Sequence, residues 1–188
     1  MEINDNHLIE GTVVMIDSYK KGLAGFVPKA IKWFTGAKYH HAGIVASRKE
    51  DGDRLWVYEA VAEGFVPTCT VEDWQKKVGV QFGAVYSLPH TNIIGADYLF
   101  RERLYQIEGS PYDFFSLILW QSIYQLYKKL GMKGKWLGNK GSRAKNTIYC
   151  TEAVAYILGY EEWWAYDPKR LYDRIACDKN RKGWKEAN

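Results

Sequence analysis

The first half of the chain is a succession of short apolar segments separated by turn residues, and this pattern constrains the fold most. The segments share strand length and β-branched or aromatic side chains, and they occupy residues 11–17, 41–47, 55–62, 64–67 and 80–88. Such spacing is typical of short strands, and Asp51-Gly52 between two of them predicts a hairpin turn. We therefore predict a meander of four or five antiparallel strands.

Helical patterns surround and follow these strands. The expected helices share apolar spacing of three or four residues, and they lie at 27–34, 98–107, 114–129, 150–158 and 169–175. A short amphipathic turn is expected at 71–76. Residues 131–145 are rich in glycine and lysine and predict a loop. Strands followed by helices indicate an α+β fold. With 188 residues, 47% of them hydrophobic, the chain suits a single domain spanning residues 1–188.

Charge and hydropathy exclude several classes. The net charge of +4 is too small for a dedicated nucleic-acid binder. Residues 1–10 lack the basic start and apolar core of a secretory signal, so we expect a cytoplasmic protein, and action on a cell wall after release stays open. The longest apolar stretch, residues 114–127, is too short and too polar for a membrane span, so we expect no stable membrane insertion. Oligomeric state is left open.

Three cysteines occur, Cys69, Cys150 and Cys177, and none of them forms a CxxC motif. This spacing argues against a disulfide framework or a cysteine-based zinc site. Cys150 stands where a helix is expected to begin, and unpaired backbone N–H groups there would stabilise a thiolate and a developing oxyanion. Cys69 and Cys177 have no such setting and are interpreted as structural. A buried, inert Cys150 remains the alternative.

A histidine is the natural partner for a reactive cysteine. Strand alternation places His41 on the same face as Gly43, where the lack of a side chain leaves room beside the imidazole. Glu59 lies in the next strand, within an apolar segment where an unpartnered carboxylate is costly to bury. If the two strands pair, Glu59 can orient His41 as the third member of a catalytic triad. The alternative places Glu59 on a solvent-facing edge.

Other side chains are candidates for lesser roles. His40, His41 and Glu59 could in principle bind zinc, but adjacent strand residues point to opposite faces, so we expect neither metal nor cofactor. Tyr112, Asp113 and Tyr149 are the candidate substrate-binding residues. Asp113 has a competing interpretation as the N-cap of the helix expected at 114–129.

Several segments together resemble the circularly permuted NlpC-type, papain-like cysteine hydrolases, the YiiX-like family. The resemblance rests on GTVVMIDS, KAIKWFTGAKYHHAGIV, VYEAV, PYDF, YCTEAV and DPKRLYD, in that order. It implies a papain-like fold, a small antiparallel sheet or barrel packed against helices. In this family the histidine precedes the cysteine, so His41, Glu59 and Cys150 match the catalytic positions. His40 and Thr12 depart from the family pattern.

Together these features predict a cysteine peptidase or amidase that acts through a thioacyl intermediate. The resemblance implies a peptide or acyl-amide substrate, such as a cell-wall stem peptide or amino-acid conjugate. One alternative is a lipid acyltransferase or thioesterase of the lecithin retinol acyltransferase type, with residues 114–127 lining a lipid groove. Another is a non-catalytic binding module that uses Trp163, Trp164 and the basic segment 133–145.

Overall fold

The computed structural model of the protein describes residues 8–18, 26–88, 96–113, 130 and 147–182. Its centre is an antiparallel sheet in the order β4-β3-β2-β1-β5. The strands are β1 (Val13–Ser18), β2 (His41–Ser47), β3 (Leu55–Val61), β4 (Gly64–Thr70) and β5 (Phe82–Leu88). The expected α+β architecture, an antiparallel sheet packed against helices, is confirmed at this level.

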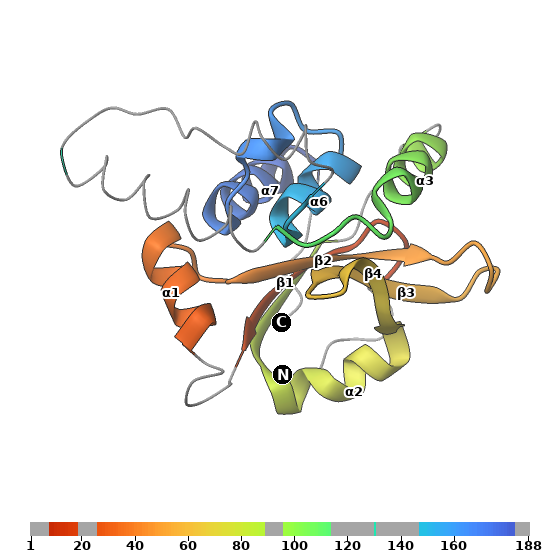
Figure 1. The fold of residues 1–188 in the computed structure, drawn as a ribbon, viewed down its shortest axis with the longest axis horizontal. Coiled ribbons are helices and arrows are strands. Elements are labelled where there is room, and N and C mark those ends of the chain that lie inside the picture. Colours follow the sequence, from red (N-terminus) through yellow and green to blue (C-terminus); the bar gives the residue numbers. More distant parts are fainter. Residues whose placement is uncertain (1–7, 19–25, 89–95, 114–129, 131–146, 183–188) are drawn as a thin grey trace.

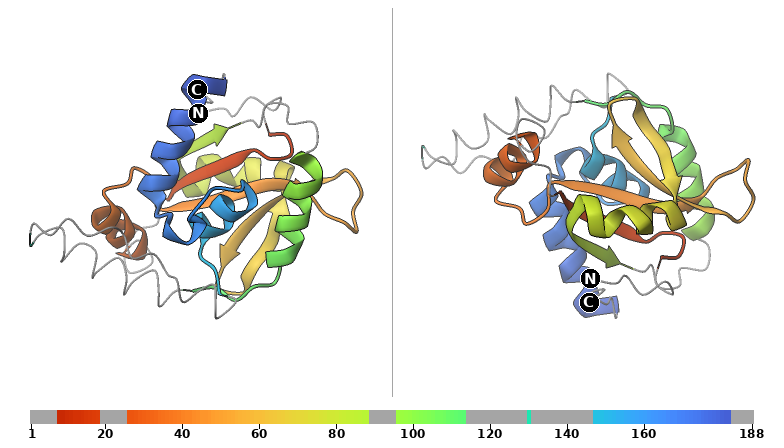
Figure 2. Two further views of the ribbon diagram at one scale, coloured as in Figure 1. Left: turned by 90° about the horizontal axis from the view of Figure 1, so that it is seen from above. Right: turned by 90° about the horizontal axis from the view of Figure 1, so that it is seen from below.

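Helices lie on both sides of the sheet (Figures 1 and 2). They are α1 (Phe26–Thr35), α2 (Val71–Gln81), α3 (Ala96–Ile107), α6 (Cys150–Ile157), the 3-10 helix η3 (Trp163–Ala165) and α7 (Pro168–Lys182). Helices α6 and α7 cover one face, α3 lies at one end of that face, and α2 crosses the opposite face. Among the described helices, none combines the length and apolar character that crossing a membrane requires.

The strand order departs from the predicted meander at β5. Strands β1 to β4 follow one another in space, but β5 pairs with β1 and not with β4. Helix α2 is the reason, because it carries the chain back across the sheet before β5 begins. Strand β1 is therefore internal and β4 is an edge strand, where Pro67 can be accommodated without losing a ladder hydrogen bond.

Strand alternation divides the interior into two hydrophobic clusters. Met15, Ile44 and Tyr58 lie on the face covered by α6 and α7, together with Val154 and Leu171 from those helices. The second cluster lies on the other face and contains Val14, Ile16, Val45, Val57, Val71 and Trp74. The central strands therefore bury apolar side chains on both faces of the sheet.

Local patterns located most elements well. The strand expected at 41–47 coincides with β2, and the helix expected at 27–34 lies within α1. Helices α2 and α7 are longer than predicted, ending at Gln81 and Lys182. The helix expected at 114–129 and the loop at 131–145 lie outside the described residues.

Gly64, at the start of β4, packs closely against Ser110, in the turn that follows α3. Its φ is +118°, and a Cβ there would lie 2.8 Å from the carbonyl oxygen of Ser110. Phe65 pairs with the same turn, donating its N–H to Ser110 O and accepting one from Gly109. We expect Gly64→Ala to lower the free energy of unfolding by about 2 kcal/mol or more, since backbone strain and a clash add.

Gly52 provides the matched control for this prediction. Its φ is +65°, but nothing lies within 4 Å of the position of an added Cβ. Gly52→Ala should therefore cost only about 1 kcal/mol, from backbone strain alone. Denaturant unfolding of both variants measures the difference, and equal losses would contradict the proposed contact between Gly64 and Ser110.

Candidate active site

His41 and Glu59 meet on neighbouring strands. Gly43 of β2 pairs with Glu59 of β3, and His41 lies two residues before Gly43 on the same face. The Glu59 Oε1 atom accepts a hydrogen bond from Nε2 of His41 at 3.0 Å. Both side chains are mostly buried, with 19% of His41 and 12% of Glu59 exposed. The solvent-facing alternative for Glu59 is therefore wrong.

Gly43 makes this approach possible. A Cβ at Gly43 would lie 3.0 Å from Glu59 Cγ, 3.0 Å from the carbonyl oxygen of Tyr58 and 3.2 Å from a methyl group of Val14. These contacts are tighter than normal packing allows, and two of the three partners belong to core or backbone. Glycine is thus required here for space rather than for backbone conformation.

Thr68 is a member of this group that sequence reasoning missed. Its hydroxyl donates to Glu59 Oε2 at 2.6 Å, on the side of the carboxylate away from His41. The β3–β4 register shifts between Val57 and Tyr58, so Thr68 is the extra residue of a β-bulge, a feature that redirects side chains. Pro67 directly before it was the available signal, since proline within a strand marks an edge or a bulge.

These hydrogen bonds determine the charge of Glu59. Burial by itself raises the pKa of the Glu59 carboxyl, but the hydrogen bond and charge of His41 and the hydrogen bond from Thr68 outweigh burial and lower that pKa. Glu59 is accordingly ionised at neutral pH and accepts hydrogen bonds on both oxygens. An ionised carboxylate fixes the imidazole with Nε2 protonated.

Cys150 is the first residue of α6 and is 2% exposed. The start of the helix is held by two hydrogen bonds to the carbonyl oxygen of Tyr166, from the Tyr149 hydroxyl at 3.1 Å and the Thr151 hydroxyl at 2.5 Å. At the first position of a helix the Cys150 N–H has no partner within the helix. The helix start therefore presents a sulfur and an unpaired backbone donor side by side.

Cys150 acts on the imidazole of His41 and is among the groups that raise its pKa. Nδ1 is the ring nitrogen that remains for a partner, because Nε2 is bonded to Glu59. Burial lowers the pKa of His41, but Cys150 and Glu59 outweigh it and raise that pKa to about 10.

The candidate substrate-binding residues surround Cys150 with different exposures. Tyr112 is half-buried and forms a parallel bridge with Ile148, and burial together with Cys150 raises the pKa of its hydroxyl. Asp113 is buried, and its Oδ2 accepts a hydrogen bond from the Thr147 hydroxyl at 2.8 Å. Tyr149 points into the core, where its hydroxyl is bonded to Tyr166. Of the three, Tyr112 is the most exposed.

His40 has separate partners from His41. Its Nδ1 lies 3.6 Å from the Asp17 carboxylate, which also accepts hydrogen bonds from Lys32 at 2.8 and 3.0 Å. Burial and the neighbouring His41 lower the pKa of His40 to about 4. Within the described ranges, no group of three or more His, Cys, Asp or Glu residues is arranged to hold a metal ion.

The remaining cysteines and the tryptophan pair lie elsewhere. Burial raises the pKa of the Cys69 thiol, which is unfavourable for a nucleophile. Cys177 lies within α7, and its side chain is outside the described part. Trp163 and Trp164 pack edge to face in η3 and are both partly buried. The basic segment 133–145 is outside the described residues.

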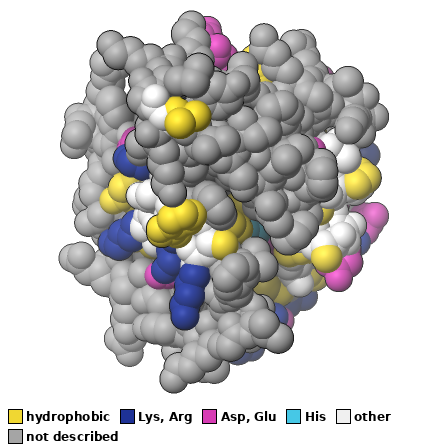
Figure 3. Space-filling view, turned by 60° about the vertical axis from the view of Figure 1, so that its left-hand side comes forward, with side chains coloured by type: hydrophobic (Ala, Val, Ile, Leu, Met, Phe, Trp, Pro, Cys, Tyr) yellow, Lys and Arg dark blue, Asp and Glu magenta, His cyan; other side chains and the backbone are white. Residues whose placement is uncertain are grey.

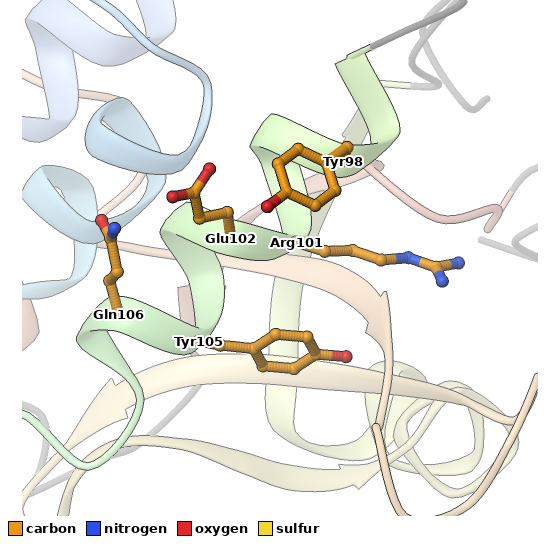
Figure 4. Close-up of a pocket in the computed structure, with 5 residues that line it drawn as sticks. All are labelled: Tyr98, Arg101, Glu102, Tyr105 and Gln106. Atoms are coloured by element: carbon orange, nitrogen blue, oxygen red, sulfur yellow. The ribbon is translucent and has the colours of Figure 1, made fainter.

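A pocket of about 770 Å³ is lined by residues of α3 and contains none of the triad candidates. Its lining residues are Tyr98, Arg101, Glu102, Tyr105 and Gln106 (Figure 4). Arg101 is bound to Glu10 at 2.6 Å, so part of this lining links α3 to the segment before β1.

The surface in Figure 3 shows a histidine side chain only as a small area inside a recess.

No protein-family model matches the chain, and no curated protein matches it in sequence.

The contacts around Glu59 predict how His41 titrates. Glu59→Gln removes a negative charge next to the ring, so we expect the pKa of His41 to fall from about 10 by about 1–3 pH units. Thr68→Val removes one hydrogen bond from the carboxylate and should lower the pKa of His41 in the same direction by less. Proton NMR of the imidazole C–H groups measures both values.

His40 is the internal control in the same spectra. Its low pKa results mainly from burial and secondarily from His41, so it should titrate near its original value in both variants. An unchanged His41 titration in Glu59→Gln would contradict the assignment of Glu59 as its partner.

Proposed function

We propose that the protein is a thiol hydrolase that cleaves an amide bond, with Cys150 as nucleophile, His41 as general base and acid, and Glu59 as the group that orients His41. One observation carries this proposal. Glu59 holds Nε2 of His41 by a 3.0 Å hydrogen bond, and Cys150 acts on the same imidazole and raises its pKa. A thiol, an imidazole and a carboxylate associated in this order form the arrangement of an activated nucleophile.

The reaction divides into two halves with balanced proton transfers. Because the pKa of His41 is raised to about 10, Nδ1 already holds the proton from the Cys150 thiol at neutral pH, and Sγ attacks the carbonyl carbon to form a tetrahedral intermediate. Collapse breaks the C–N bond, and the imidazolium gives its proton to the leaving amine. Water then attacks the thioester with neutral His41 as base, the C–S bond breaks, the carboxylic acid product leaves, and His41 keeps the proton taken from water.

Two donors are available for the oxyanion of the intermediate. The backbone N–H of Cys150 is the first, because it has no partner within the helix. We infer that the Tyr112 hydroxyl is the second, since burial and the nearby Cys150 raise its pKa, which keeps it protonated as a donor. This role replaces a general substrate-binding role for Tyr112.

The resemblance to the permuted NlpC-type family supports a peptide-type amide as substrate. The order of the chain is consistent with that family: a histidine strand, a carboxylate strand and, about a hundred residues later, a helix opened by cysteine. The acyltransferase alternative rested on residues 114–127, which lie outside the described part. A binding module would have no need of a buried histidine paired with both a thiol and a carboxylate.

Removal of the nucleophile or base tests the proposal. Cys150→Ala and His41→Ala should each reduce hydrolysis of peptide amides by about a thousandfold or more, as loss of a triad member does. Cys69→Ala and His40→Ala are matched controls that should keep most of the activity. Circular dichroism checks the fold of each variant.

The substrate panel contains cell-wall stem peptides, amino-acid conjugates and phospholipid vesicles. Amide hydrolysis that persists in Cys150→Ala would show that the mechanism is wrong. Turnover of phospholipid with no turnover of any amide would replace the amidase by the acyltransferase alternative.

Tyr112→Phe tests the second oxyanion donor. Because a hydrogen bond to the oxyanion is formed in the transition state, its loss should reduce kcat by about 100-fold while KM changes little. Steady-state kinetics on the best substrate from the panel separates the two parameters. A raised KM with normal kcat would mean that Tyr112 binds substrate and does not stabilise the intermediate.

A further inference from the structure

Glu152 is a buried carboxyl group that the mechanism above does not use. It lies two residues after Cys150 in α6 and is 0% exposed. Its Oε2 accepts the backbone N–H of Tyr149 at 3.4 Å, so the side chain turns back toward the start of its own helix. Its Oε1 is buried and has no hydrogen-bond partner among the described residues.

The surroundings of Glu152 disfavour a negative charge. Burial raises the pKa of the Glu152 carboxyl well above its usual value, the nearby Asp113 and Cys150 raise it further, and the Tyr149 backbone N–H lowers it only in part. None of the charged groups that act on it most strongly is a cation. A carboxyl in such a site is expected to remain protonated at neutral pH.

Among the described residues, the groups that act most strongly on this carboxyl include no cation. Tyr112 lies on the same segment as Asp113, and Asp167 at the start of α7 acts on Tyr149. His41 of β2 is the nearby cationic group, but it faces the sulfur of Cys150. The protonation of Glu152 is thus governed mainly by burial, to which Asp113 and Cys150 add.

Glu59 and Glu152 are therefore two buried carboxyls in opposite states near one nucleophile. Glu59 is ionised because His41 and Thr68 donate to it, and its charge stabilises an imidazolium. A second carboxylate beside the sulfur would repel a thiolate, since like charges at short range in a buried site interact strongly. Two carboxyl groups whose surroundings shift their pKa values in opposite directions commonly have different roles.

We propose that Glu152 is a positioning residue for Cys150 that works as a neutral carboxylic acid, accepting the Tyr149 N–H to hold the helix start without adding a charge beside the thiolate. This inference rests on the proposed function only in taking Cys150 as the nucleophile. It concerns how that nucleophile is held and not what it cleaves.

Alkylation of Cys150 by iodoacetamide at pH 7, followed by mass spectrometry, tests the role of Glu152 without a substrate. Glu152→Gln keeps the acceptor and stays neutral, so the rate should remain within about threefold of the original. Glu152→Ala removes the acceptor and should slow the reaction about tenfold. An increase of about tenfold or more in Glu152→Gln would show that Glu152 is ionised in the native protein and would overturn the proposal, as would an unchanged rate in Glu152→Ala.

Infrared spectroscopy provides a direct test that survives if an alanine variant does not fold. The native protein at pH 7 should show the C=O stretch of a buried protonated carboxyl, and this band should be missing in Glu152→Gln. No difference between the two spectra would overturn the inference. Failure of the proposed function looks different: Cys150 would label no faster than Cys69 in the native protein, whatever the infrared result.

Discussion

The burial of the Glu59 carboxylate is the constraint on which the site depends. An ionised carboxylate removed from water is destabilising by several kcal/mol unless charged or polar groups satisfy it, and the structure supplies partners from both sides. His41 donates from β2 and Thr68 from a bulge in β4. Gly43 leaves the space in which the carboxylate fits. These contacts fix the register of β2, β3 and β4 around one charged side chain.

Cys150, the proposed nucleophile, belongs to the other layer of the fold. Helix α6 packs over the sheet, and its first turn is held by the carbonyl of Tyr166 and the carboxyl of Glu152. The sheet thus determines the orientation of the imidazole, whereas the helices determine the position of the sulfur. Because one hydrophobic cluster joins the helix layer to the sheet, packing between the layers also places Cys150 relative to the sheet.

Much of the fold and of the site follows from local patterns. The alternation in 41–47 located β2, Cys150 was correctly placed at the first residue of a helix, and Gly159 lies just beyond the end of that helix with a φ of +71°. The pairing of Glu59 with β2 followed from hairpin geometry across Asp51-Gly52. These inferences succeeded because each depends on residues that are close in sequence.

The inferences that failed or were missed depend on long-range geometry. The position of β5 beside β1 results from the path of α2 over the sheet, which no local pattern encodes. Thr68 reaches Glu59 only because of a one-residue bulge, and Tyr149 turns into the core because the Tyr166 carbonyl lies there. Side chains next to a motif in sequence can therefore point away from the site that the motif forms.

The sequence by itself determined the strand and helix types, because periodicity is a local property. Residue chemistry is local too, and it named Cys150, His41 and Glu59 as candidates and Gly43 as the residue that leaves room between His41 and Glu59. Tertiary structure alone decided that His41 and Glu59 form a hydrogen bond, that Cys150 acts on the same imidazole, and that the pKa of Glu59 is lowered while that of Glu152 is raised. The physical reason is that protonation depends on the burial and the partners that packing creates. The same residue type, in the same chain, carries opposite charge states near one sulfur atom.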